Sequence, residues 1–362
     1  MTAEIDRVKP ALTPLHALYK EMEADLNDAR GGFGWWYGHF DQASVMFATD
    51  YLLQTVEQIA DTLGEAAQHE REFNEAWYGQ TTRLRQDPGN AAYVRHLNSV
   101  SVRKYALRID KALAGFFGAC GSSLDFLAAC TIGVLGLRAD LVTASWSTIA
   151  TAKSGNEKVR RRILATEDTA GRKLQDDAVS DIYHTLHGEP DGWLTWTLDM
   201  RNMMIHRPRR IHPHMIYRRH RRDELQLAMQ LPRNPQLTDA EALVISDRDT
   251  DLYLWEHAGT TLDGVLSNLI QATSKIANIL QSAWLARRNE PTLLKQPKEQ
   301  WQKVYPERRD LSHFSGFGGD TLPPTDQKVT ATPGLMDRRL RAARLTDEDR
   351  SYWVKNLLTR DE

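Results

Sequence analysis

The chain has 362 residues, of which 41% are apolar and 26% charged, a composition that supports a globular core and argues against wholesale disorder. Its net charge of −2 excludes a generic polycation, so any affinity for nucleic acid must come from local charge. The two cysteines, Cys120 and Cys130, exclude a disulfide framework and a zinc ribbon, and they fit core thiols in a reducing, cytoplasmic compartment. No secretory signal is visible at the N-terminus.

The pattern of the chain predicts a mainly α fold: a helical bundle with a small antiparallel β insertion and an extended C-terminal arm. We expect four parts. They are an N-terminal segment (1–40), a helical domain (41–288) with its β insertion at about 215–256, a linker or loosely packed arm (289–334), and a short helical tail (335–362).

Helices are expected in the first half of the domain. Apolar residues recur at three- and four-residue steps from Val45 to Leu63, which indicates an amphipathic helix, and a charged helix continues to Arg85. A turn is predicted at 87–90, followed by a second helical block over 91–117.

A long apolar segment, 112–137, carries the single charge of Asp125. Its length could span a bilayer, but it is interrupted by glycines, and a carboxylate near the bilayer centre costs about 2.5–3.5 kcal/mol by insertion scales. We therefore expect a buried core helix and no membrane partner. Residues 153–172 are polar and basic, and predict a connecting loop with a short helix.

Further along, a break at 188–192 precedes a predicted helix from Trp193 to His206, with Asp191 as its N-cap and Pro208 as its stop. Alternating apolar residues predict a strand at 225–231, with 243–245 and 252–255 as candidate partner strands.

The last clear helix is expected to have Thr260 or Thr261 as its N-cap. Its apolar seam runs through 262–283 and favours the core over a second subunit.

The stretch from Arg201 to Arg222 is the strongest pointer to chemistry, with eight arginines, four histidines and no acidic residue. On a helix Asn202 and His206 share a face, whereas Arg201 lies about 140° away from His206. Two copies paired across a two-fold axis could bring the arginine of one helix to the histidine of the other. Without such a site, Arg201 would form a structural ion pair and His206 would cap a helix C-terminus.

The segment Asp-Met-Arg-Asn-Met-Met-Ile-His-Arg-Pro at 199–208 resembles the motif of the HEPN superfamily. That motif is an arginine followed after four to six residues by a histidine, very often with asparagine directly after the arginine. This chain matches it at Arg201, Asn202 and His206. The resemblance covers roughly 40–285 and is specific only at 199–208.

The resemblance implies a helical bundle that dimerises and, in many members, cleaves RNA without a metal or other cofactor. It also implies an acidic residue on an earlier core helix that contacts the motif arginine. Asp125 is our candidate, because a lone carboxylate in an apolar segment should be paired. A setting in toxin or phage-defence biology follows from the family alone, and a regulatory protein partner that contacts the C-terminal tail is a separate hypothesis.

The remaining arginines after the motif are either an RNA-binding surface or a solvated loop that balances acidic helices: Arg207, Arg209, Arg210, Arg218, Arg219, Arg221 and Arg222. The nearby histidines lack a cysteine or acidic residue to complete a metal site, so none is expected. The aromatic residues at 35–37 favour core packing over base stacking.

We therefore expect a HEPN-like endoribonuclease that acts as a homodimer on RNA and leaves a 2′,3′-cyclic phosphate. Two alternatives remain: a catalytically inactive RNA- or nucleotide-binding or regulatory module, and an interaction scaffold that uses the 262–283 seam and the C-terminal arm.

Overall fold

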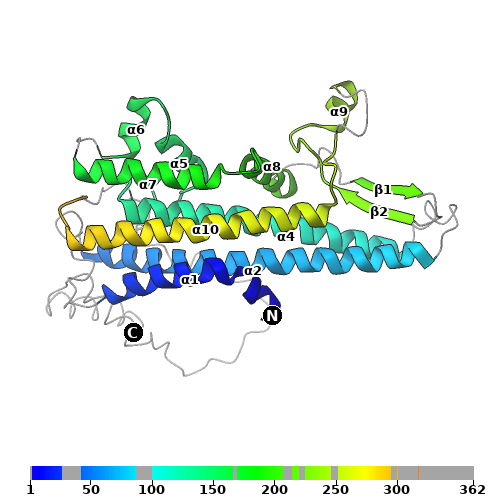
Figure 1. The fold of residues 1–362 in the computed structure, drawn as a ribbon, viewed down its shortest axis with the longest axis horizontal. Coiled ribbons are helices and arrows are strands. Elements are labelled where there is room, and N and C mark those ends of the chain that lie inside the picture. The colour runs from blue at the N-terminus through cyan, green and yellow to red at the C-terminus, as the bar shows by residue number, and fades with distance from the viewer. Residues whose placement is uncertain are drawn as a thin grey trace. The chain divides into compact units, whose positions relative to one another are not determined.

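The computed structural model describes residues 2–26, 42–86, 100–165, 169–206, 214–219, 225–245, 252–294, 300 and 317. Within these residues the chain is mainly helical, as the sequence predicts (Figure 1). Residues 35–37 and the predicted tail at 335–362 lie outside the described residues.

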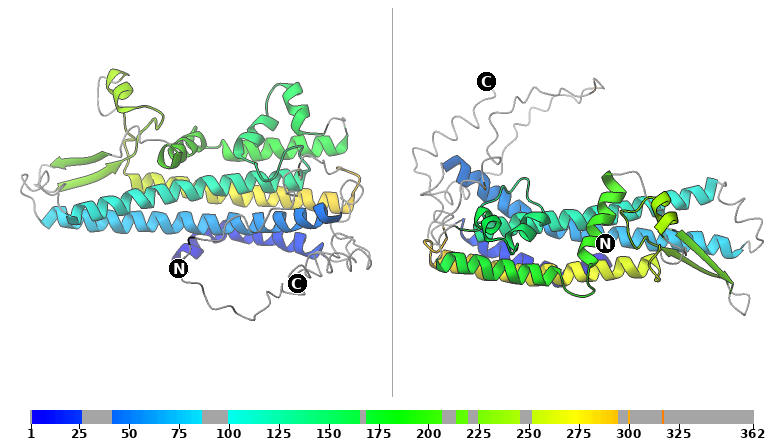
Figure 2. Two further views of the ribbon diagram at one scale, coloured as in Figure 1. Left: turned by 180° about the vertical axis from the view of Figure 1, so that it is seen from behind. Right: turned by 90° about the horizontal axis from the view of Figure 1, so that it is seen from above.

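The chain folds into two compact units, and five helices contribute a part to each unit. These helices are α1 (Thr2–Ala24), α2 (Gln42–Gln86), α4 (Val100–Leu135), α7 (Ala170–Leu186) and α10 (Ala258–Asn289). Unit 1 comprises Met1–Leu15, Gln58–Phe126 and Asp181–Ala277, and unit 2 comprises His16–Glu57, Leu127–Ser180 and Asn278–Glu362. Within each unit, segments of α2, α4 and α10 run alongside one another (Figure 2).

The N-terminal helix α1 is an element that the sequence analysis did not anticipate. Its mixed charge and its two internal prolines, Pro10 and Pro14, hide the helical pattern. Nevertheless Val8, Leu18 and Met22 are almost completely buried. This part of the chain therefore contributes to the cores of the two units.

Helices α2 and α4 agree with the predicted helical blocks. Helix α2 continues through Gly64 and ends at Gln86, directly before the predicted turn at 87–90, which lies outside the described residues. Helix α4 unites the second predicted block with the apolar segment. It is long and apolar enough to cross a membrane, but most of its apolar stretch is buried against the rest of the chain. The prediction of a buried core helix is confirmed.

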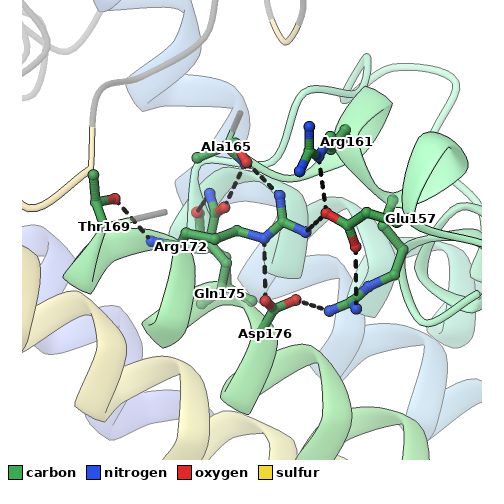
Figure 3. A network of polar contacts seen from close by, with 9 residues as sticks. Glu157, Arg161, Ala165, Thr169, Arg172, Gln175 and Asp176 are labelled. Atoms are coloured by element: carbon green, nitrogen blue, oxygen red, sulfur yellow. Dashed lines mark hydrogen bonds and ion pairs between the residues drawn. The ribbon is translucent and has the colours of Figure 1, made fainter. Parts of the chain in front are cut away.

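Unit 2 carries two short helices, α5 (Trp146–Ala152) and α6 (Glu157–Ile163), and the first part of α7. A polar network ties α6 to α7 (Figure 3). Arg172 donates from Nε to Asp176 over 3.1 Å and from Nη2 to Glu157 over 3.3 Å, and it also donates to the carbonyl of Ala165. Because Arg172 is only 6% exposed, these contacts offset the loss of its hydration.

The β insertion of unit 1 differs in part from the prediction. Strand β2 (Leu225–Gln230) forms as expected, but its antiparallel partner is β1 (His214–Arg219). The predicted partner at 243–245 was wrong, because this segment belongs to α9 (Asp239–Ile245).

The cause is a capping box at the start of α9. The Thr238 hydroxyl accepts from the Glu241 backbone N–H over 3.2 Å, and the Glu241 carboxylate accepts from the Thr238 N–H over 2.8 Å. The second candidate strand, at 252–255, forms only an isolated bridge between Pro232 and Tyr253.

Two predicted helix caps lie one to four residues away from the observed ones. Helix α8 (Trp193–His206) has the predicted bounds, but the first intrahelical acceptor is the carbonyl of Gly192, so Asp191 is not the N-cap. Helix α10 begins at Ala258, after His257, whose carbonyl accepts from Thr260 and Thr261. The predicted caps of α10, Thr260 and Thr261, therefore lie within the first turn of the observed helix.

The apolar seam of α10 belongs to the core, as predicted. Every residue that defines it is at most 2% exposed: Leu262, Leu266, Leu269, Thr273, Ile276, Leu280 and Ala283. Helix α10 ends at Asn289, where the sequence changes character. Within the predicted arm, Gln300 is fully buried, so this part of the arm is packed against unit 2.

The C-terminal end of α4 is held in unit 2 by three buried side chains. Arg287 donates from Nη1 to the carbonyls of Gly133, over 3.2 Å, and Val134. The amide of Gln175 donates to the carbonyls of Leu135 and Gly136. Gln300 donates to two further carbonyls, those of Ile132 and Leu137. Carbonyls at a helix C-terminus lack intrahelical donors, and a buried end needs such partners.

We predict that Arg287→Met lowers the free energy of unfolding by about 1–3 kcal/mol, because two buried carbonyls lose a donor. Burial lowers the pKa of Arg287 to about 9, so the side chain is still charged at neutral pH. Urea denaturation of the full chain measures the effect. The control is Arg162→Met on the exposed surface of α6, which should change stability by less than about 0.5 kcal/mol. Equal effects of the two substitutions would contradict the capping role.

Candidate active site on helix α8

Helix α8 carries the Arg-Asn-x-x-x-His segment in unit 1. Its buried residues are spaced so that they face one side: Trp193, Leu194, Thr197, Met200 and Met203. That side packs into the unit and leaves the rest of the helix half-buried or exposed. In Figure 1 the helix is viewed nearly along its axis, whereas α4 and α10 run across the view.

Two glycines of α4 make room for α8. A Cβ added at Gly121 would lie 2.5 Å from Nε of Arg201, which is closer than atoms can approach. A Cβ added at Gly118 would lie 3.2 Å from the end of Ile205. Because neither glycine has a side chain, the arginine stem and the isoleucine can lie directly on the α4 backbone.

Arg201 forms an ion pair with Asp125, as the sequence analysis anticipated. Nη1 of Arg201 lies 2.9 Å from Oδ2 of Asp125, and the two side chains are 24% and 29% exposed. Nε of Arg201 is buried and makes no hydrogen bond within the described part of the chain. The guanidinium is therefore held by its stem and by one carboxylate, and part of it faces solvent.

The other two motif residues follow on the same helix. Asn202 is half-buried, and its side chain makes no hydrogen bond to any residue that the structure describes. His206 is the last residue of α8, and its side chain lies outside the description. Along the helix, His206 is five positions after Arg201, a rise of about 7.5 Å with a rotation of about 140°.

The predicted basic surface is described only in part. Arg218 and Arg219 lie on β1, where they pair in register with Gln226 and Leu225. The other five arginines, at 207, 209, 210, 221 and 222, lie outside the described residues.

The β insertion is attached to α8 and to α2. Nε1 of Trp196 donates to the carbonyl of Pro232 over 3.0 Å, and the Trp196 ring meets Phe117 edge-on. His257 lies within hydrogen-bonding distance of the Met229 backbone and packs against Trp77. Desolvation lowers the pKa of His257, so its ring stays neutral at neutral pH.

A further histidine, His69 of α2, contacts α4 close to Gly118 and was missed by the sequence analysis. Its ring rests against Gly115, three residues before the glycine that Ile205 contacts. Nδ1 of His69 is 3.0 Å from Oε2 of Glu72. The pKa of Glu72 is lowered, first by a hydrogen bond from Gln68 and then by His69 and Lys111. The signal in the sequence was a His and a Glu three residues apart on a helix, together with glycines at every third position from 115 to 121 on α4.

Among the described residues, no group of three or more His, Cys, Asp or Glu side chains could hold a metal ion. Cys120 and Cys130 are buried, and desolvation raises the pKa of both thiols, to about 12 for Cys130. This agrees with the predicted core thiols.

Comparisons with protein-family models, with curated proteins and with solved structures found no match for this chain.

We predict that Gly121→Ala lowers the free energy of unfolding by about 1–3 kcal/mol, because the new methyl group displaces the Arg201 stem. The matched control is Gly64→Ala in α2, where an added Cβ would meet no atom within 4 Å. That control should raise stability by about 0.4–1 kcal/mol. Chemical denaturation of both variants provides the measurement, and stabilisation by Gly121→Ala would refute the close packing of α8 on α4.

Proposed function

We propose that the chain is a HEPN-like, metal-independent endoribonuclease that acts as a homodimer. The observation that carries the proposal is the position of Arg201. This partly exposed arginine lies on the helix that ends at His206, and Asp125 of α4 holds it in place. An arginine, an asparagine and a histidine thus share one short helix, beside a basic stretch of sequence.

The proposed reaction is transesterification within RNA. His206 takes the proton from a 2′-hydroxyl, and the 2′-oxygen attacks the adjacent phosphorus. The bond from phosphorus to the 5′-oxygen breaks, and that oxygen leaves with a proton. Arg201 stabilises the charge that builds on the phosphate oxygens. The products are a 2′,3′-cyclic phosphate and a 5′-hydroxyl end.

The pairing with Asp125 suits this role. Because Nη1 of Arg201 lies 2.9 Å from Oδ2 of Asp125, the pair fixes the direction of the guanidinium. Arg201 keeps further N–H groups that Asp125 Oδ2 does not occupy, because a guanidinium has five donors. These N–H groups can bind phosphate while the Asp125 carboxylate holds the other side of the guanidinium.

A second copy of the chain completes the proposed site. Positions 201 and 206 lie about 140° apart around one helix, so one copy does not easily direct both residues at the same phosphate. In a two-fold dimer, the arginine of one copy can face the histidine of the other.

The second candidate function is a non-catalytic RNA-binding module of the same fold. The observation that favours it is that Asp125 balances the charge of Arg201 within hydrogen-bond distance. In this case the chain would bind RNA without cutting it.

The first test is cleavage of labelled single-stranded RNA in the presence of EDTA. We expect cleavage that survives chelation and leaves cyclic phosphate ends, and a loss of about 100-fold or more in His206→Ala, since general-base catalysis contributes about 10²–10⁴-fold. The control is His16→Ala, an exposed histidine of α1, which should retain full activity. Undiminished cleavage by His206→Ala would reject the assignment, and binding without cleavage would favour the module.

A second test asks whether two copies share the site. Arg201→Ala and His206→Ala are inactive alone, but mixing them in equal amounts after reversible dissociation should restore about a quarter of the wild-type activity. Half of the dimers are then mixed, and each mixed dimer holds one intact site of two. No recovery, with mixed dimers demonstrated by differently tagged copies, would show that the site lies within one copy.

A further inference from the structure

Helix α4 carries a row of basic residues that the motif does not include. Lys104, Arg108 and Lys111 are all exposed, and they lie in unit 1 near the start of the helix. None of the three makes an ion pair with any residue, within what the structure describes. Their ammonium and guanidinium groups are therefore available to a ligand.

The row points along α4 toward the motif. Lys104, Lys111, Gly118 and Asp125 are spaced by seven residues, and an α-helix drifts only about 20° per seven residues. All four positions thus lie within about 60° on one face, with about 10 Å of rise between successive members. Arg108 lies one turn from both lysines.

The end of α8 lies beside this face. Arg201 contacts α4 at Gly121 and Ile205 contacts it at Gly118, so α8 approaches the N-terminal half of α4 as it runs toward His206. The basic row starts about 10 Å beyond Gly118, at Lys111. It therefore lies on the face of α4 that α8 contacts, on the N-terminal side of that contact.

We propose that Lys104, Arg108 and Lys111 form a track that binds the phosphate backbone of single-stranded RNA on one side of the Arg201–His206 site. The proposal rests on the proposed function. Residues three or four apart on a helix have Cβ atoms about 5–6 Å apart, which lets long basic side chains meet successive phosphates of one strand. Because the contacts are to the backbone, the track is indifferent to base sequence.

Two carboxylates, Asp110 of α4 and Glu72 of α2, lie close to the track and limit its charge. The pKa of Glu72 is lowered by a hydrogen bond from Gln68 and by charges that include Lys111, so this carboxylate stays ionised near the track. It is also engaged by His69 at 3.0 Å. The lysine nonetheless stays exposed and makes no ion pair with it among the described contacts.

The test measures the affinity of labelled oligouridine for the full chain over a series of salt concentrations, in the His206→Ala background so that the probe stays intact. Addition of Lys104→Gln, Arg108→Gln and Lys111→Gln should reduce the slope of log K against log salt by about 2, since each single-strand phosphate contact contributes about 0.7. The same rule gives a Kd about 100-fold higher at 0.1 M salt, with the difference vanishing near 1 M.

The matched control removes the same charges in unit 2, by Lys158→Gln, Arg162→Gln and Lys173→Gln, all of which are exposed. An unchanged slope in the control and a reduced one in the track variant would support the track. Equal slopes in both variants would overturn it.

The outcome is separable from that of the nuclease proposal. If the chain with His206 intact does not cut RNA, but the slope against salt is still reduced in the track variant, the binding track is supported and the nuclease proposal is rejected. If the chain cuts RNA and the track variant binds like the control, the nuclease stands and the track fails.

Discussion

The site around Arg201 depends on the absence of side chains at two positions of α4. Gly118 and Gly121 let α8 lie directly on the α4 backbone, and the stem of Arg201 occupies the place where a Cβ would be. Asp125, one turn further along, then reaches the guanidinium at 2.9 Å. The two features thus act together. The glycines allow the two helices to come close, and the ion pair sets the direction of the arginine side chain.

Helix α4 has a different role in each part of its length. Its first part carries the exposed basic residues Lys104, Arg108 and Lys111, its middle carries the glycines and Asp125, and its C-terminal end is buried beneath donors from other elements. Helix periodicity keeps Lys104, Lys111, Gly118 and Asp125 on one face of α4. The basic residues therefore lie on the same face as the two residues that contact α8. The proposed RNA site is therefore an extended surface of unit 1 and not an isolated pair of residues.

Several features could be predicted from the sequence because they depend on local rules. The bounds of α8 followed from a glycine- and proline-rich break and from Pro208, and the buried seam of α10 followed from its three- and four-residue steps. That Asp125 needs a cationic partner also followed, since a carboxylate in an apolar helix requires one, whereas the choice of Arg201 rested on the resemblance to the HEPN motif. The capping box that turns 243–245 into a helix was present in the sequence but was outweighed by the apolar run.

What the sequence by itself determined is a mainly helical chain with buried seams, and one helix that carries Arg201, Asn202 and His206. Only the tertiary structure decided that β1 pairs with β2, that α1 contributes to the core, and that glycines of α4 receive α8. The physical reason is that periodicity specifies which face of an element is buried, whereas the identity of its partner depends on contacts between residues far apart in the chain.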